Sequence, residues 1–331
     1  MKKLLTILLL LSPMTSHADS AAPVLTGNGD WRYEFVQGWD HLDDGSPIGP
    51  THGGVVVDPQ TGLVYVSTNA EHGILVYEAD GTPVGAIAPQ CQDFHAMEVH
   101  VEDGKTVIYG AQLGGPKPLR ICKIDTEGNE LMEISEATFG EIEGGWNGLT
   151  GVTVAPDGSI FISMGYGSNL IHKFSAGGEL LLTFGGQGEE DGKFRTCHGL
   201  AIDSRFDDEP RLLVVDRENR RLVHFDLDGN WIGTHASHLR RPCSVTFHGD
   251  HIAVAELAGR VTVLGKNGAP VAFLGDNPDH SQRAQFRVAL DEIAPDVFTS
   301  PHGITFDGDG NLYVMDWNAT GRVSKLAKFG N

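Results

Sequence analysis

Short stretches in which apolar and polar residues alternate recur along most of this chain, separated by turns rich in glycine and aspartate. The clearest one begins at His302 and reads His-Gly-Ile-Thr-Phe-Asp, then a turn, then Leu-Tyr-Val-Met-Asp. Alternation with a period of two predicts β-strands with one buried face, and Asp-Gly and Gly-Asn turns predict antiparallel hairpins. No long stretch keeps a helical period. We therefore predict an all-β protein.

The alternating unit occurs six times. Its first strand begins near residues 52, 95, 150, 198, 243 and 302, and a third strand and a glycine-led fourth strand follow in most copies. A unit of four short strands that recurs about every 40 to 50 residues is typical of a propeller blade, and the spacing of these six copies is similar. The sequence therefore predicts a six-bladed β-propeller. An open β-sandwich or a pair of β-domains is the alternative.

The sixth copy has no fourth strand of its own, because the sequence ends at Asn331 soon after the third strand. The segment Trp31–Val36 precedes the first copy and alternates as a strand does. We predict that this N-terminal strand completes the last blade, which closes the ring and removes an exposed sheet edge. Because one repeat array fills most of the chain, we expect residues 19–331 to form a single domain.

The first 18 residues do not follow the repeat. Two lysines precede an apolar run at residues 4–11, and small residues precede Asp19. This pattern predicts a signal peptide over residues 1–18, cleaved after Ala18, with an apolar run too short to span a bilayer. We therefore expect a secreted or periplasmic protein.

The chain is strongly acidic. Its formal charge of −20 becomes −22 when the signal peptide removes two lysines. An acidic surface repels phosphate groups, so we expect neither nucleic acid nor a membrane as a partner. We expect a monomer.

Four cysteines, Cys91, Cys122, Cys197 and Cys243, suggest disulfides in an exported protein. Of the three possible pairings we favour Cys91–Cys122, within one copy, together with Cys197–Cys243, near the first strands of neighbouring copies. Cys243 also occupies the position where other copies carry histidine. A thiolate metal ligand is therefore the alternative to a disulfide or a buried thiol there.

Histidine begins the first strand in four of the six copies, at His52, His95, His198 and His302. Positions in every second blade of a six-bladed ring lie about 120° apart, and the last three histidines belong to the second, fourth and sixth copies. Three imidazoles with one open position favour catalytic Zn²⁺, although Cu, Fe and Ni accept the same ligands. His52 is a candidate fourth ligand or proton donor, or has a structural role. A histidine-lined pocket for a sugar or an anion is the alternative to a metal.

Two loops that follow second strands are expected at the same mouth. They contain Tyr166, in Gly-Tyr-Gly-Ser-Asn, and Arg217, in Asp-Arg-Glu-Asn-Arg. An arginine suits a substrate carboxylate, and a divalent metal can lower the pKa of a tyrosine so that it acts as a base. Alternatively, Asp216, Arg217 and Asn219 only hold their turn together.

These phrases carry a resemblance to a known family. The loops around Tyr166 and Arg217, the phrase His-Gly-Leu-Ala at His198 and the phrase Pro-His at His302 resemble the NHL-repeat six-bladed propellers. Within that family they are similar to the peptidyl-α-hydroxyglycine α-amidating lyases, most clearly from Thr150 to the end. Such lyases are zinc enzymes that release glyoxylate from a hydroxylated C-terminal glycine and leave a peptide amide.

The resemblance implies zinc ligands at His95, His198 and His302, a catalytic tyrosine at Tyr166 and a catalytic arginine at Arg217. It also implies a structural Ca²⁺. The implied reaction is a metal-assisted elimination in which Arg217 holds the substrate carboxylate and Tyr166 takes a proton.

This sequence departs from the lyase pattern. Gly303 stands where the lyases have an acidic residue after the last zinc histidine, which removes a calcium contact. No arginine in the first copy matches the second catalytic arginine, the family's disulfide positions do not map onto these cysteines, and no copper monooxygenase domain is present. A metal-dependent lactonase or esterase, and a non-catalytic propeller that binds a protein or glycan, are therefore alternatives.

The longest segment between copies runs over residues 276–300. Its part from Gln282 to Leu290 predicts a short helix over the mouth. This segment is a candidate lid that selects the substrate, or a decorated loop.

Overall fold

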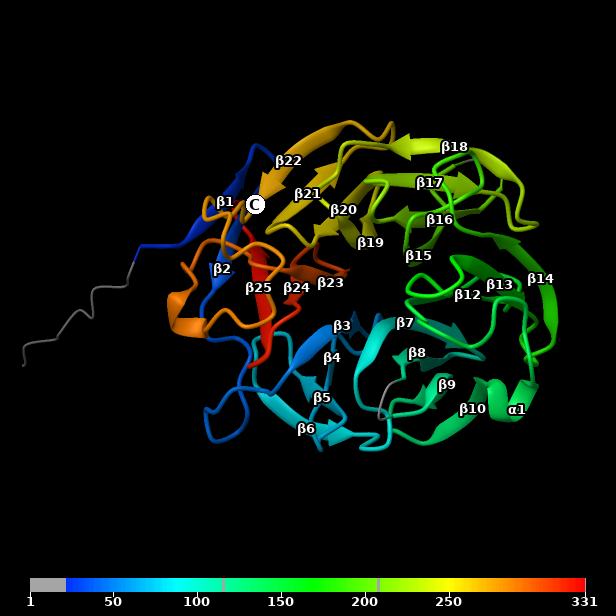
Figure 1. Cartoon of the computed structure of the whole chain (residues 1–331). Helices are drawn as coiled ribbons and strands as arrows, with labels where there is room; N and C mark the ends of the chain where they lie inside the picture. Colours follow the sequence, from blue (N-terminus) through cyan, green and yellow to red (C-terminus); the bar gives the residue numbers. More distant parts are fainter. Residues whose placement is uncertain (1–21, 115–116, 207–208, 331) are drawn as a thin grey trace, which may run out of the picture.

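Six antiparallel sheets surround a central axis in the computed structural model, which describes residues 22–114, 117–206 and 209–330 (Figure 1). The innermost strands are β3 (Thr51–Val57), β7 (Phe94–Glu102), β11 (Gly151–Val154), β15 (Cys197–Asp203), β19 (Pro242–His248) and β23 (Pro301–Phe306). Each begins within one residue of its predicted start. The six-bladed β-propeller is confirmed. The expected signal peptide lies outside the described residues.

The other strands follow outward in each blade. The second strands are β4 (Val64–Thr68), β8 (Lys105–Leu113), β12 (Ile160–Ser163), β16 (Arg211–Asp216), β20 (His251–Glu256) and β24 (Leu312–Asp316). The third strands are β5 (Ile74–Tyr77), β9 (Leu119–Asp125), β13 (Leu170–Phe174), β17 (Arg221–Phe225), β21 (Arg260–Leu264) and β25 (Arg322–Lys328). The outer strands of the first five blades are β6 (Pro83–Ile87), β10 (Glu130–Ser135), β14 (Leu180–Gly185), β18 (Trp231–Ala236) and β22 (Pro270–Leu274).

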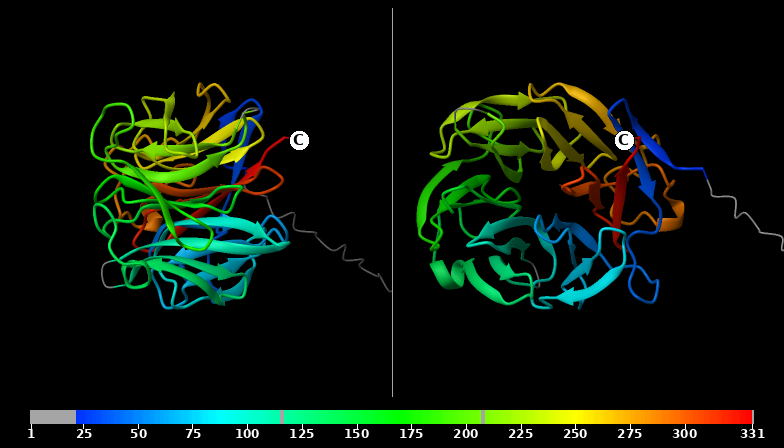
Figure 2. Two further views of the ribbon diagram at one scale, coloured as in Figure 1. Left: turned by 90° about the vertical axis from the view of Figure 1, so that its right-hand side faces the viewer. Right: turned by 180° about the vertical axis from the view of Figure 1, so that it is seen from behind.

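The N-terminal strand β2 (Trp31–Val36) closes the ring, as predicted. It pairs antiparallel with β25 and so supplies the fourth strand of the sixth blade. A strand that the sequence did not predict, β1 (Leu25–Asn28), pairs with the outer edge of β2. Figure 2 shows from behind how these first strands lie against the last one. Strands from near the two termini therefore pair in one sheet, and their hydrogen bonds close the ring.

Apolar side chains fill the space between neighbouring blades. The described residues form six buried clusters, one for each pair of adjacent blades. Between the sixth and first blades the Trp39 ring lies 5.0 Å from that of Tyr77 and 5.2 Å from that of Tyr313. Strands with alternating apolar residues bury one face against each neighbour, and so every blade is held from both sides.

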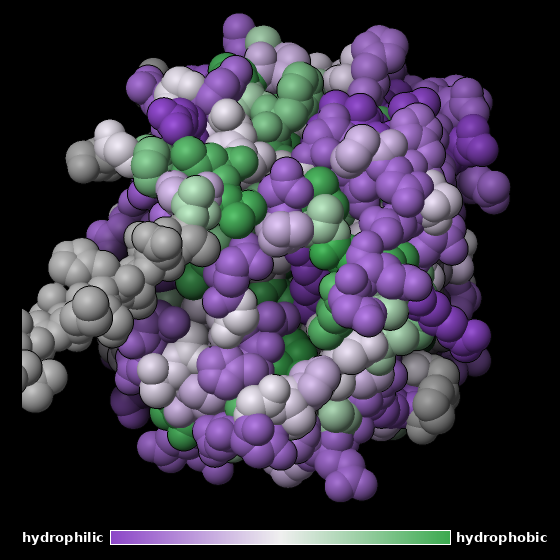
Figure 3. All heavy atoms as spheres, turned by 90° about the vertical axis from the view of Figure 1, so that its left-hand side faces the viewer, coloured by the Kyte–Doolittle hydropathy of each residue, from purple (hydrophilic) through white to green (hydrophobic). Residues whose placement is uncertain are grey.

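Hydrophilic residues cover most of the side of the ring shown in Figure 3, with hydrophobic residues in smaller areas between them. Among the described residues, no helix is long and apolar enough to cross a membrane.

The predicted helix over residues 282–290 is wrong. This stretch consists of turns, followed by a single 3₁₀ turn, η1 (Leu290–Glu292). Ala284 has a φ of +57°, a left-handed conformation that cannot continue a right-handed helix. The one α-helix in the described residues, α1 (Glu136–Phe139), follows β10, where Ser135 and Thr138 form a capping box.

The favoured disulfides are not present in the structure, in which all four cysteines are buried free thiols. The Cys197 sulfur faces the Leu170 carbonyl at 3.9 Å, whereas the Cys243 sulfur faces the Arg241 carbonyl at 3.8 Å. These two thiols therefore point to different partners. Cys91 and Cys122 lie close together, with Glu130, but are not bonded.

Candidate metal centre

Glycines allow the innermost strands to approach closely around the axis. A Cβ atom at Gly53 would lie 2.4 Å from the His95 carbonyl oxygen, and one at Gly199 would lie 2.5 Å from that of Cys243. A Cβ atom at Gly303 would lie 2.2 Å from the Gly53 carbonyl oxygen. These distances leave no room for a side chain. Glycine after three of the four first-strand histidines therefore brings neighbouring strands together, so that the starts of these strands meet at the axis.

The three alternating histidines form a nearly equilateral triangle at the axis. The ring centroids of His95, His198 and His302 are 4.6 to 4.7 Å apart, and each residue is at most 3% exposed. Burial lowers the pKa of all three imidazoles well below the ordinary value, with further lowering by their charged neighbours. They are therefore neutral at pH 7 and can act as metal ligands.

Backbone carbonyls set the tautomers of two of these rings. His95 Nδ1 lies 2.6 Å from the Thr150 carbonyl oxygen, and His198 Nδ1 lies 2.8 Å from that of Cys243. A carbonyl oxygen only accepts, so each Nδ1 carries the proton and each Nε2 presents a lone pair. Both carbonyls belong to the first-strand position of the next blade. The propeller repeat itself thus orients the rings.

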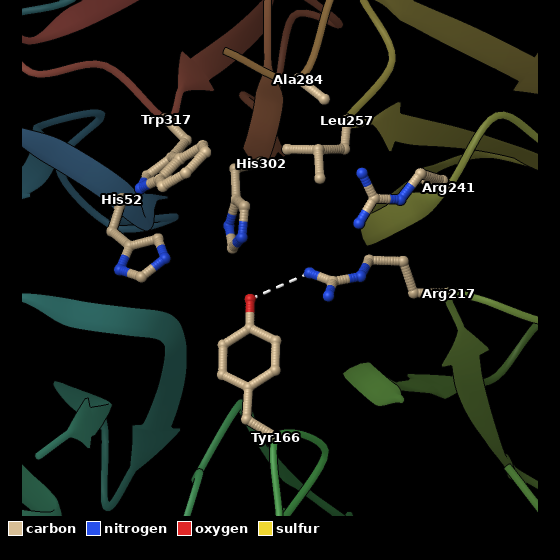
Figure 4. A pocket seen from close by; sticks show the side chains of 8 residues that line it. All are labelled: His52, Tyr166, Arg217, Arg241, Leu257, Ala284, His302 and Trp317. Carbon is tan, nitrogen blue, oxygen red and sulfur yellow. Dashed lines mark hydrogen bonds between the residues drawn. The ribbon is translucent and has the colours of Figure 1, made fainter. Parts of the chain in front are cut away.

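Tyr166 brings its hydroxyl to these lone pairs. The oxygen lies 3.2 Å from His95 Nε2 and 3.0 Å from His198 Nε2, and Arg217 Nη1 donates a hydrogen bond to it at 2.9 Å (Figure 4). The hydroxyl has one proton, so it can donate to only one imidazole at a time. His302 Nδ1 is buried and has no hydrogen-bond partner among the described residues. This centre thus has more lone pairs than donors.

The donor atoms around His302 fit a transition metal, but the predicted set of His95, His198 and His302 is divided between two groups. Possible ligand atoms lie within 4.8 Å of one another in two groups that share His302: one adds His52 and His95, and the other adds His198 and Cys243. Nitrogen and sulfur ligands suit Zn²⁺, and also Cu, Fe or Ni. The expected Ca²⁺ needs oxygen ligands, which these groups do not offer. A bound cation would satisfy the lone pairs that the protein leaves without donors.

His52 lies beside the triangle rather than in it. Its ring centroid is 4.4 Å from that of His95 and 4.7 Å from that of His302, and its Nδ1 lies 3.6 Å from a carboxylate oxygen of Asp93. This contact is longer than a hydrogen bond. All three interpretations of His52, as a ligand, as a proton donor or as a structural residue, agree with this position.

Arg241 is a site residue that the sequence analysis missed. Its Nη2 donates to Glu218 at 2.7 Å, and Arg217 Nε donates to the same carboxylate at 3.0 Å. Two guanidinium groups share one carboxylate, so one positive charge is left facing the mouth. Arg241 stands two residues before the first-strand position of the fifth copy. That spacing could have indicated a residue at the mouth, although no sequence motif surrounds it.

A cavity of about 450 Å³ opens above the histidines, and its lining residues are shown in Figure 4. Arg217 and Arg241 lie on one side of it, and His52 and Trp317 lie on the other. Trp317 follows Asp316 at the end of β24, as Arg217 follows Asp216 at the end of β16. The same place in the repeat could have been used to predict Trp317 at the mouth, but the sequence analysis predicted only Arg217 there. The mouth therefore has a cationic wall and an aromatic wall.

The segment over residues 276–300 contributes Ala284 to this cavity. It is held to neighbouring loops by hydrogen bonds from Ala319 N to the Phe286 carbonyl at 2.8 Å and from Asn277 N to the Gly259 carbonyl at 2.9 Å. The Phe286 and Trp317 rings lie 4.9 Å apart. The segment is thus a fixed wall of the mouth, built without the predicted helix.

Burial raises the pKa of Tyr166 to about 12, although the positive charge of Arg217 acts in the opposite direction. The residue as a whole is 41% exposed, while its hydroxyl contacts two imidazoles and a guanidinium. The protein alone therefore does not lower this pKa, and the expected base would need a bound cation.

Comparisons with known proteins show similarity to NHL-repeat proteins over most of the chain. No protein-family model matches the chain. Human NHL repeat-containing protein 3 is 27% identical over 278 residues, which cover 74% of this chain and 74% of that protein. This chain is a homologue of NHL-repeat propellers.

This chain is also similar to amidating enzymes. Rat peptidylglycine alpha-amidating monooxygenase is 29% identical over 179 residues, and Xenopus laevis peptidyl-glycine alpha-amidating monooxygenase B is 30% identical over 180 residues. These matches cover 50% and 51% of this chain but only 17% and 19% of those proteins.

Solved structures show the shared fold. A gluconolactonase from Xanthomonas campestris superposes with a TM-score of 0.61 at 13% identity, covering 93% of this chain and 95% of that one. A streptogramin B lyase superposes with a TM-score of 0.56 at 16% identity, covering 85% and 93%.

Proposed function

We propose that this NHL-repeat homologue is an exported metal-dependent lyase that eliminates an amide or related group from a carbon bearing a hydroxyl and a carboxylate. The observation that carries the proposal is the Tyr166 hydroxyl, which meets two imidazole Nε2 atoms and a guanidinium at one point. The similarity to amidating monooxygenases over half of this chain supports it.

Each residue at the mouth has a role in this proposal. Arg217 and Arg241 bind the substrate carboxylate on the cationic wall. A metal held by His95, His198 and His302, for which Zn²⁺ is our proposal, supplies Lewis-acid polarisation of a substrate oxygen.

Proton transfer is assigned to two side chains. Tyr166, as the phenolate, takes the hydroxyl proton of the substrate while the carbon–nitrogen bond breaks, so that the carbon becomes the aldehyde of glyoxylate. The departing nitrogen receives a proton and leaves as an amide. In this proposal, His52 supplies that proton.

Metal analysis and a product assay test the proposal. Protein purified without added metal should contain about one transition-metal ion per chain, and it should release glyoxylate from an N-acyl-α-hydroxyglycine. The variants His95→Ala, His198→Ala and His302→Ala should lose both properties. Unchanged ligand binding in metal-free protein would instead support a non-catalytic propeller. Hydrolysis of a lactone or ester without glyoxylate release would assign a hydrolase.

Export is tested separately. Expression of the full chain in a bacterium should give a periplasmic or secreted protein whose first residue is Asp19. A cytoplasmic product that keeps its lysine-containing start would contradict export and leave the chemistry unaffected.

A further inference from the structure

Cys243 occupies in the fifth blade the position that histidine occupies in four others. It is the second residue of β19 and is fully buried. Its sulfur and ring nitrogens of His198 and His302 lie within 4.8 Å of one another. A thiol at this distance from two imidazoles belongs to the same potential coordination sphere.

A second observation points to a ligand at this place. His302 is 3% exposed, and its Nδ1 has no hydrogen-bond partner among the described residues, whereas the Nδ1 atoms of His95 and His198 each meet a carbonyl of the next blade. A buried polar atom without a partner is costly. A cation bound by His302 through this nitrogen would remove that cost.

Cys243 lines a second cavity. A small cavity of about 70 Å³ on the channel side of the histidines is lined by Cys243, His198 and His302, but not by Tyr166 or Arg217. The mouth cavity is lined by Tyr166, Arg217 and His302, but not by Cys243. The Cys243 side chain also interacts with Arg217, so the thiol lies between the channel and the mouth.

We propose that Cys243 is a thiolate ligand of the metal centre, together with His198 and His302. The inference rests on the metal part of the proposed function and is independent of the reaction. When the sulfur–metal bond forms, the thiol proton passes to solvent, and the weak contact between the sulfur and the Arg241 carbonyl at 3.8 Å is given up.

A thiolate changes which metals the centre prefers. Three imidazoles accept several divalent ions, but a thiolate favours Zn²⁺, Cd²⁺ and Cu⁺ over Mg²⁺, Ca²⁺ and Mn²⁺. The centre of this chain should therefore be selective for thiophilic metals.

Cobalt substitution tests the ligand directly. Chelator-treated protein loaded with one equivalent of Co²⁺ should show a thiolate-to-cobalt charge-transfer band in the near ultraviolet. Cys243→Ser should abolish this band and weaken Zn²⁺ binding at least about tenfold. Cys243→His, which restores the residue type found in the other blades, should bind Co²⁺ without the band. Cys197→Ser is the matched control, because it removes a buried thiol beside His198, and it should keep the band.

The outcomes separate this inference from the proposed function. One bound Co²⁺ without a charge-transfer band in the unaltered protein, or a band that survives in Cys243→Ser or Cys243→His, overturns the thiolate ligand and leaves the lyase proposal standing. No bound metal at all overturns both. A band together with no glyoxylate release supports the ligand and contradicts only the reaction. Circular dichroism verifies that each variant is folded.

Discussion

A single residue position explains most of the candidate centre. The second residue of the innermost strand is His in four blades and Cys243 in the fifth, and Thr150 directly precedes that strand in the third. Glycine follows this position in four blades, at Gly53, Gly151, Gly199 and Gly303, and lets the strands approach. The chemistry at the axis therefore depends on six side chains at one repeated position and on the loops that reach over them.

Tyr166→Phe tests the residue that joins the histidines to Arg217. The variant should keep its metal and lose turnover by roughly 10²- to 10⁴-fold, because it removes a proton acceptor without removing a ligand. Glyoxylate release and metal content are measured on the same sample. Tyr109→Phe, which removes a hydroxyl bonded to Glu102 outside the centre, is the control. Undiminished turnover in Tyr166→Phe would exclude it as the base.

Gly303→Ala tests the close approach of the strands. Its Cβ would lie 2.2 Å from the Gly53 carbonyl oxygen, so we expect the free energy of unfolding to fall by about 1 to 3 kcal/mol. Gly308→Ala has no atom within 4 Å of its new Cβ and should change little. Equal stability of both variants in urea denaturation would show that the strands can separate. The same crowding explains why an acidic residue is absent at this position.

At the scale of elements, the last three blades share an arrangement that holds their loops. Each second strand ends in a buried acid, at Asp216, Glu256 or Asp316. Each acid accepts a hydrogen bond from a backbone N–H just before the innermost strand and pairs with the arginine that begins the third strand. The acid thus fixes the loop that carries the next residue, which is Arg217 in the fourth blade and Trp317 in the sixth.

Arg221→Ala tests this arrangement. Arg221 Nε donates to Asp216 at 2.7 Å, and Asp216 is fully buried, so the variant leaves a buried charge without its partner. We expect a loss of about 3 to 5 kcal/mol in the free energy of unfolding. Arg195→Ala removes an exposed pair with Glu189 and should cost about 0 to 1 kcal/mol. Similar small losses in both variants, measured by denaturation, would contradict the role of the buried acid.

At the scale of the whole molecule, stability depends on the seam between the two chain ends. β2 pairs with β25, and the Asp40 carboxylate just beyond β2 accepts a hydrogen bond from Val323 N at 2.6 Å. Burial raises the pKa of Asp40 to about 6, although that hydrogen bond acts in the opposite direction. A titratable group is therefore built into the closure of the ring.

Asp40→Asn tests the pH dependence of this seam. Because the pKa of Asp40 is higher in the folded state than its ordinary value, the unfolded chain loses the proton first, and stability falls as pH rises from about 4 through 6. The contribution lost is about 3 kcal/mol at most. The free energy of unfolding of the asparagine variant, minus that of the unaltered protein, should therefore be larger at pH 8 than at pH 4. A difference that is constant with pH, by urea denaturation at both values, would exclude this effect.

The alternation of apolar residues and the spacing of the repeats were enough to predict the blades, their number and the closing strand β2. Both are local signals, because each strand buries one face and each blade repeats the same hairpins. The histidine position could be predicted for the same reason. His95, His198 and His302 occupy one place in the repeat, and ring symmetry brings equivalent places together.

Only the tertiary structure decided how side chains from different blades meet. Arg241 reaches Glu218 and the mouth from a loop without a motif, and the Cys243 sulfur lies within 4.8 Å of ring nitrogens of His198 and His302, which no spacing in the sequence records. The segment over residues 276–300 has helix-forming residues, yet hydrogen bonds to two neighbouring loops hold it in turns. Contacts between blades depend on distances across the ring, and the alternation within one blade contains no information on them.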